Sequence, residues 1–196
     1  MWRLIAILLA LCVAPAHAGN QKYEPLSASV RAALHSAISD QTVPFLAFDT
    51  VGEARAWLNA MSGKLERRFP DRRQREEFLV TVHYEAKRAA LDPQMVLGLI
   101  QVESAFRKHA LSTAGARGLM QVMPFWIKEI GQPQDNLFHL RTNLRYGCVI
   151  FKHYLDLERG DYFRALGRYN GSLGQAEYPN LVLRAWKTNW EYTPGT

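Results

Sequence analysis

Residues 103–124, with the sequence ESAFRKHALSTAGARGLMQVMP, place one carboxylate at a predicted helix end and follow it with a glycine-rich turn. The helix is predicted upstream, because Asp92 and Pro93 suit an N-cap and a first-turn proline and apolar residues then recur at helical spacing. Glu103 falls on this apolar stripe near the C-terminal end of the helix. Burial and the negative pole of the helix should both raise the pKa of its carboxyl group, so we expect Glu103 to hold a proton near neutral pH.

The turn after this helix contains Ser112, followed by Gly115 and Gly118 three residues apart. Such glycines indicate positive φ angles or a close approach of the backbone to a ligand. The amide of Gln121 can hydrogen-bond sugar hydroxyls or an N-acetyl group, and a protonated Glu103 is the general acid that a glycosidic oxygen needs. Each of these two features has an alternative interpretation when taken alone. Glu103 could be a solvated residue at a frayed helix end, and the glycine-rich turn could be an ordinary loop. GARG does not have the spacing of a phosphate-binding loop.

Taken together, the serial order ES, S and GARGLMQVMP resembles the catalytic core of the lytic transglycosylases of the Slt type, which have a goose-type lysozyme-like fold. ALDPQMVLGLIQVES from Ala90 is similar to the opening catalytic helix of that family, and DNLFHLRTNLRYGCVIFKHYL from Asp135 to its next block. RYNGS from Arg168 is similar to the AYN-G element, and Tyr178 fits the closing helix. The resemblance covers residues 90–190. It implies a mainly α fold, a helical bundle around a substrate cleft, with at most a small β-hairpin within residues 112–123.

The resemblance also implies an activity. A lytic transglycosylase cleaves the β-1,4 bond between N-acetylmuramic acid and N-acetylglucosamine in peptidoglycan and leaves 1,6-anhydromuramic acid ends. Glu103 is then expected to work alone, first as acid and then as base, because the C6 hydroxyl of the muramic acid attacks C1 in place of water. The residues expected to bind the sugars or to shape their pocket are Ser112, Met120, Gln121, Tyr169 and Asn170. We expect no cofactor and no metal, since the histidines lack ligand spacing.

The chain departs from the family pattern at a few places. Arg168 stands where alanine is usual, Ser172 where glycine is common, and Phe125 and Trp126 follow the MP dipeptide where small residues are common. We expect Trp126 to be a core residue, with stacking on a sugar ring as the alternative.

Two other functions remain open from the sequence. A lysozyme-like hydrolase would use water and a second carboxylate, for which Glu129 and Asp135 are the nearest downstream acids, although neither has a context typical of a partnered acid. A secretion or conjugation machine could instead use this fold as an assembly component. The Glu103 carboxylate favours an enzyme over both a binding protein and an inactive relative.

The N-terminal residues predict export. Arg3, the apolar residues 4–13 and the sequence AHA ending at Ala18 are typical of a signal peptide, so residues 1–18 are expected to be removed. A lipoprotein signal at Cys12 is disfavoured by Leu11. No later stretch is apolar enough to span a bilayer, so we expect a location in the periplasm or cell envelope without a transmembrane segment.

Charge and cysteine content fit this location. The chain of 196 residues has a net charge of +6, and loss of Arg3 lowers it by one. A mildly basic surface suits the carboxylates of peptidoglycan stems, and no nucleic-acid module is recognisable. Cys148 would be the only cysteine left, so no intramolecular disulfide can form, and its helical spacing predicts a small core residue.

Residues 19–89 predict an N-terminal helical elaboration of a catalytic core at 90–196, and together they are expected to form one compact unit. Helices are predicted at 27–38, after a capping box at Thr50 and Glu53, and after Asp71. The basic residues around the second junction are expected to form a solvated surface. They are Arg67, Arg68, Arg72, Arg73 and Arg75.

Overall fold

The computed structural model describes residues 21–193, so the predicted signal peptide and Cys12 lie outside the described residues. Within this range the chain forms α-helices and no strand, and none of its helices is long and apolar enough to cross a membrane. The helices are α1 (Ala28–Ile38), α2 (Val51–Leu65), α3 (Arg72–Arg88), α4 (Pro93–Ser104), α5 (Phe125–Ile130), α6 (Leu140–Leu157), α7 (Tyr162–Asn170), α8 (Glu177–Ala185) and the π-helix η1 (Trp186–Trp190). The prediction of a mainly α fold is confirmed.

Local capping explains where the helices begin. Thr50 accepts a hydrogen bond from the backbone N–H of Glu53 while the Glu53 carboxylate accepts from the Thr50 N–H, which completes the predicted capping box of α2. Asp71 caps α3, and Asp92 caps α4 by accepting from the Gln94 N–H at 2.7 Å. These side chains satisfy backbone donors that no preceding helical turn can pair.

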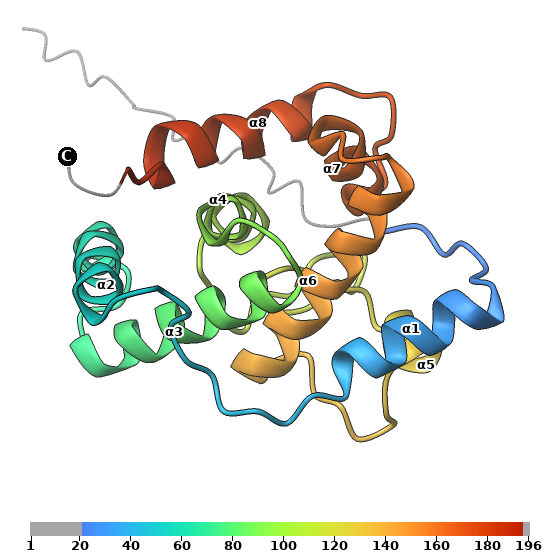
Figure 1. The fold of residues 1–196 in the computed structure, drawn as a ribbon. Helices are drawn as coiled ribbons and strands as arrows, with labels where there is room; N and C mark the ends of the chain where they lie inside the picture. Colours follow the sequence, from blue (N-terminus) through green and yellow to red (C-terminus); the bar gives the residue numbers. More distant parts are fainter. Residues whose placement is uncertain (1–20, 194–196) are drawn as a thin grey trace, which may run out of the picture.

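Helix α4 lies near the centre of the molecule and packs against α3, α8 and η1 (Figure 1). Almost all of its side chains are buried, as expected for a helix that packs on every side. Gly98 allows η1 to approach closely, because a Cβ at this position would lie 2.9 Å from the backbone nitrogen of Trp186. Helix α4 therefore carries Glu103 on a tightly packed support.

The turn region contains two isolated antiparallel bridges and no regular hairpin. Arg117 pairs with Leu111 on one side and with Val122 on the other. The β-structure thus lies where the sequence predicted it, within and beside residues 112–123, but it consists of single bridges and not of a hairpin.

A buried carboxylate joins the N-terminal segment to α3 and α6. Glu85 is completely buried and forms ion pairs with Arg88, Arg141 and Arg145. These arginines also donate to backbone carbonyls at the end of α1 and just after it, including a 3.0 Å bond from Arg145 to the Ile38 carbonyl. One charge network therefore fixes α1 against the helices behind the candidate site.

The buried apolar side chains form one cluster that runs from Leu34 to Trp190. Helix α3 belongs to this cluster although it precedes residue 90, and only a short connection separates it from α4. The division into residues 19–89 and 90–196 remains a prediction.

The prediction of a solvated arginine cluster is wrong for Arg75. This side chain is buried, and its guanidinium donates to the Ser62 hydroxyl at 2.6 Å and to the Phe69 carbonyl at 2.5 Å. It closes the corner between α2 and α3, because an arginine has enough donors to satisfy several acceptors at once. The other four arginines of the cluster are exposed.

Candidate active site

Glu103 lies in the last turn of α4, and only 1% of its surface is exposed. The helix ends directly after it, because Ala105 and Phe106 adopt positive φ angles of 49° and 64°. The prediction that Glu103 is on the buried stripe near the helix end is confirmed. The alternative of a solvated residue at a frayed end is wrong.

Tyr178, in the first turn of α8, donates a hydrogen bond to Oε1 of Glu103. The pKa of Tyr178 is raised well above its usual range, first by burial and then by the negative charge of Glu103. The phenol therefore remains protonated and acts as a donor. The sequence predicts Tyr178 in the closing helix without indicating a role, and the packing of α8 on α4 brings the two side chains together.

Tyr169 approaches the same region from α7. Its hydroxyl donates to the backbone carbonyl of Met120 at 2.7 Å. Burial raises the pKa of Tyr169 well above its usual range, and the charge of Glu103 adds to this effect. Met120 itself is fully buried, and a Cβ added to Gly147 would lie 2.7 Å from its Cβ. The structure thus brings Tyr169 near Glu103 and buries Met120 against Gly147, while the place of Met120 in the pocket floor and the contact of both residues with sugars remain predictions.

Asn170 ends α7 with an acceptor still available. Its Nδ2 donates to the Ser172 hydroxyl at 3.0 Å, whereas its buried Oδ1 has no hydrogen-bond partner within residues 21–193. Buried polar atoms are usually paired, so an orphaned one is where a ligand can bind. Ser172, a departure from the family pattern, is thus the group that orients this amide.

The other departure beside this element is Arg168. Its guanidinium pairs with Glu158 and, at 3.3 Å, with Glu24. These two acids hold the Arg168 side chain, and Tyr169 and Asn170 beside it remain buried despite the larger residue.

The glycine-rich turn is held mainly by its own hydrogen bonds. The Ser112 hydroxyl accepts from the Ala116 N–H at 3.0 Å. Gln121 donates from Nε2 to the carbonyls of Gly118, at 2.8 Å, and Ala110, at 3.2 Å. Both hydrogens of the Gln121 amide are therefore engaged, and its Oε1 is the atom left for a sugar. Binding of substrate by Ser112 and Gln121 remains a prediction.

Asn143 on α6 fixes this turn from behind. Its side chain accepts from the Met120 N–H and donates to the carbonyls of Arg117 and Leu137, each at 2.8 Å. Gly118 has φ of 75°, and a Cβ there would lie 2.6 Å from the Leu137 carbonyl oxygen. A residue other than glycine would be strained and would displace the Asn143 clamp.

Gln21 is a second clamp that sequence analysis did not identify. Its Oε1 accepts from the Met123 N–H at 3.2 Å and from the Trp126 indole N–H at 3.1 Å. Trp126 is 3% exposed, so its prediction as a core residue is confirmed and sugar stacking is excluded. Cys148 is also buried, as predicted.

The two acids considered as partners of Glu103 are engaged elsewhere. Glu129 pairs with Arg31 of α1 at 3.0 Å. Asp135 accepts from the Tyr146 hydroxyl at 2.5 Å and from the Gln132 N–H at 2.9 Å. Among the described residues, no group of three or more His, Cys, Asp or Glu side chains could hold a metal ion.

Comparison with known proteins matches residues 81–180 to the family model described as Transglycosylase SLT domain. A protein named Transglycosylase from Enterobacteria phage PRD1 is 36% identical over 101 residues, 48% of this chain and 37% of its own length. Membrane-bound lytic murein transglycosylase C of Actinobacillus pleuropneumoniae serotype 5b (strain L20) is 48% identical over 99 residues, 46% of this chain and 26% of its own length. The chain thus spans well under half the length of these relatives.

Among solved structures, an inactive variant of the lytic transglycosylase Slt from Pseudomonas aeruginosa matches with 24% identity and a TM-score of 0.46. The match covers 62% of this chain and 22% of that chain.

Proposed function

Because this chain belongs to the transglycosylase SLT domain family, we propose that it cleaves the glycan strands of peptidoglycan between N-acetylmuramic acid and N-acetylglucosamine. The observation that carries the proposal is the buried Glu103 carboxyl group, held by the Tyr178 hydroxyl at the end of α4. Both residues lie within the family segment.

In the first step, the Glu103 carboxyl group donates its proton to the glycosidic oxygen as the bond from C1 of the muramic acid breaks. Tyr178 donates to Oε1 and so orients the carboxyl group. The leaving N-acetylglucosamine departs as an alcohol, and Glu103 is left as a carboxylate. A general acid of this kind contributes roughly 10²- to 10⁴-fold to the rate.

In the second step, the Glu103 carboxylate accepts the proton of the C6 hydroxyl while that oxygen forms a bond to C1. The product is a 1,6-anhydromuramic acid end, and Glu103 regains its proton for the next turnover. The same carboxyl group serves as acid and base, so no second carboxylate is required. Tyr178 remains protonated throughout and acts as a positioning residue.

For substrate binding, we assign the Asn170 Oδ1 as an acceptor for a sugar hydroxyl or N-acetyl N–H, since this atom is buried and unpaired within residues 21–193. Tyr169 and Met120 form the floor, and Ser112 and the Gln121 Oε1 line the turn. The names of the relatives support an envelope location for this chain, in which residues 1–18 act as a signal peptide. A secretion or conjugation apparatus remains a possible partner, to be tested by pull-down.

Digestion of purified peptidoglycan sacculi, followed by mass spectrometry of the soluble fragments, tests the proposal. The purified protein should release fragments that end in 1,6-anhydromuramic acid, and Glu103→Gln should release none. Fragments with ordinary reducing ends would show that the protein is a lysozyme-like hydrolase and not a transglycosylase. Activity that survives in Glu103→Gln would overturn the role of Glu103, and no release by the intact protein would favour an assembly component.

A further inference from the structure

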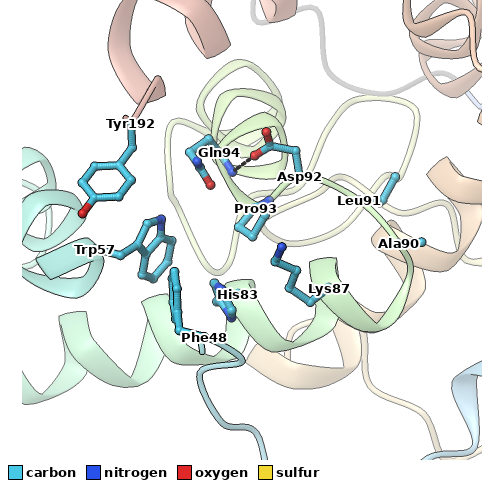
Figure 2. Close-up of a pocket in the computed structure, with 10 residues that line it drawn as sticks. All are labelled: Phe48, Trp57, His83, Lys87, Ala90, Leu91, Asp92, Pro93, Gln94 and Tyr192. Atoms are coloured by element: carbon cyan, nitrogen blue, oxygen red, sulfur yellow. Dashed lines mark hydrogen bonds between the residues drawn. The ribbon is translucent and has the colours of Figure 1, made fainter. Parts of the chain in front are cut away.

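A pocket of about 460 Å³ lies at the N-terminal end of α4, whereas Glu103 lies at the C-terminal end (Figure 2). Its lining includes Phe48, Trp57 and His83 on one side and Gln94 and Tyr192 on the other. Small-molecule sites typically have volumes of roughly 300–1,000 Å³. Gln94 is nine positions before Glu103 in the same helix, which at 1.5 Å per residue separates them by roughly 14 Å. This pocket is therefore distinct from the candidate active site.

Three of the aromatic residues that line the pocket lie outside the family match. Phe48 and Trp57 precede residues 81–180, and Tyr192 follows them. Phe48 stacks on the His83 ring with 4.6 Å between ring centroids, and the Trp57 and His83 rings meet edge to face at 4.9 Å. These three rings form an aromatic floor, next to which the Tyr192 ring stands as a wall (Figure 2). Flat aromatic faces of this kind suit the apolar C–H faces of a sugar ring.

Three nitrogens of this floor lack partners. Within residues 21–193, no hydrogen-bonding group lies within reach of the Trp57 Nε1 or of either ring nitrogen of His83, although each of these side chains is only 1% exposed. Figure 2 shows the indole nitrogen on the edge of Trp57 that faces Tyr192 and Gln94. Leaving such a group unpaired destabilises the folded protein, so a ligand that pairs with it gains affinity.

The chemistry of the orphaned nitrogens defines the ligand. Trp57 is a donor only. Burial, with a smaller effect from the positive charge of Lys87, lowers the pKa of His83 to about 4, so the imidazole is neutral at pH 7 and offers one donor and one acceptor. An N-acetyl carbonyl oxygen fits the donors, and a hydroxyl group fits the acceptor. Lys87 is exposed at the rim, where its charge suits a carboxylate.

We propose that this pocket binds an N-acetylated sugar residue of a peptidoglycan strand and anchors the strand away from the point of cleavage. The ligand class is read from the pocket, and its identification with peptidoglycan rests on the proposed function. Trp57 and the N–H of His83 would donate to the N-acetyl carbonyl oxygen, and the other ring nitrogen of His83 would accept from a hydroxyl of that sugar, with the sugar ring against the aromatic floor. Lys87 would pair with a carboxylate of the lactyl group or peptide stem.

The indole N–H resonances of the ¹⁵N-labelled Glu103→Gln protein provide the test, because this variant should not consume the ligand. The N-acetylglucosamine tetramer is titrated in, and the Trp57 signal is identified by its loss in Trp57→Phe. We expect a saturable shift of that signal. The indoles of Trp126 and Trp190 serve as matched controls, since each already donates to a glutamine oxygen and should move little. An unmoved Trp57 signal at millimolar tetramer overturns the proposal.

Two variants separate binding from structure. His83→Phe keeps a ring but removes both nitrogens, and the dissociation constant read from Trp57 should rise roughly tenfold. If that protein does not fold, judged by the Trp126 and Trp190 signals, Lys87→Gln on the surface still tests the site. It should weaken a carboxylate-bearing muropeptide about fivefold while leaving the uncharged tetramer unaffected. An affinity for the muropeptide that is unchanged in Lys87→Gln would overturn the charge pairing.

The fate of this proposal is separable from that of the proposed function. A protein that binds the tetramer at Trp57 but does not release fragments from sacculi retains the sugar pocket and loses the catalytic proposal. A protein that releases anhydro fragments with an unmoved Trp57 signal retains the catalytic proposal and loses the pocket.

Discussion

Replacing Tyr178 by phenylalanine tests how the single carboxyl group is controlled. The change keeps the buried ring, which is only 2% exposed, and removes one hydroxyl and its hydrogen bond to Oε1 of Glu103. A hydrogen bond to a charged group contributes about 1.5–3 kcal/mol. The hydrogen bond stabilises Glu103 in its ionised form, which occurs between the two steps. Losing this stabilisation corresponds to a decrease in kcat of roughly 10- to 150-fold.

The assay is the initial rate of release of anhydromuramic fragments from sacculi, with kcat and KM measured separately across pH. Tyr178→Phe should lower kcat with little change in KM, because the hydroxyl positions the acid and is not assigned a contact with the sugar. The Tyr178 hydroxyl favours the charged form of Glu103, so its removal favours the protonated form. The pH profile of Tyr178→Phe should therefore move relative to that of the unmodified protein. A merely structural tyrosine would leave this profile in place.

Tyr84→Phe is the matched control. It also removes one hydroxyl bonded to a carboxylate, because Tyr84 donates to Asp40 at 2.8 Å in the N-terminal charge network. The control should retain its kcat even if it loses some thermal stability. The positioning role of Tyr178 would be refuted if both variants lost the same fraction of activity, or if Tyr178→Phe retained full kcat and an unchanged pH profile.

Three further predictions concern stability. Glu85→Gln leaves three arginines around a buried neutral amide and should lower the free energy of unfolding by about 3–5 kcal/mol in urea titrations. The pKa of His83 is lowered to about 4 in the folded chain and is about 6.5 in the unfolded chain. The contribution of neutral His83 to the free energy of unfolding is therefore present above pH 6.5 and is lost as pH falls toward 4. The loss amounts to about 3 kcal/mol and should be absent from the same urea titrations of His83→Phe. Gly118→Ala should lower the melting temperature and the activity together, by at least about 1 kcal/mol of stability, because its positive φ and the Leu137 carbonyl both oppose a Cβ. A Gly118→Ala protein with unchanged melting temperature would contradict this.

Features that depend on neighbours in sequence were predicted well. Thr50, Asp71 and Asp92 each pair with a backbone N–H two or three residues away, so the residues that start a helix can be recognised without knowing the rest of the fold. The burial of Glu103 follows in the same way from the helical spacing of the apolar residues before it.

Features that depend on distant pairing were not predicted. Tyr178 is 75 residues from Glu103 in sequence, and Gln21 is 105 residues from Trp126. Neither side chain carries a local signal, because a tyrosine on a helix or a glutamine near the N-terminus is compatible with many environments. The error at Arg75 has the same origin, since a basic run is usually solvated unless another segment supplies acceptors.

Helix α4 links the catalytic proposal to the sugar pocket. It is buried by α3, α8 and η1, and the close approach at Gly98 leaves no room for it to slide against Trp186. Since packed interiors resist deformation, the distance between the pocket at its first turn and Glu103 at its last turn is set by helix geometry alone. A strand held in the pocket would therefore meet Glu103 at a constant distance from its anchor. Helix α2, which supplies Trp57, and the segment before it, which supplies Phe48, would then act in substrate selection as well as in stability.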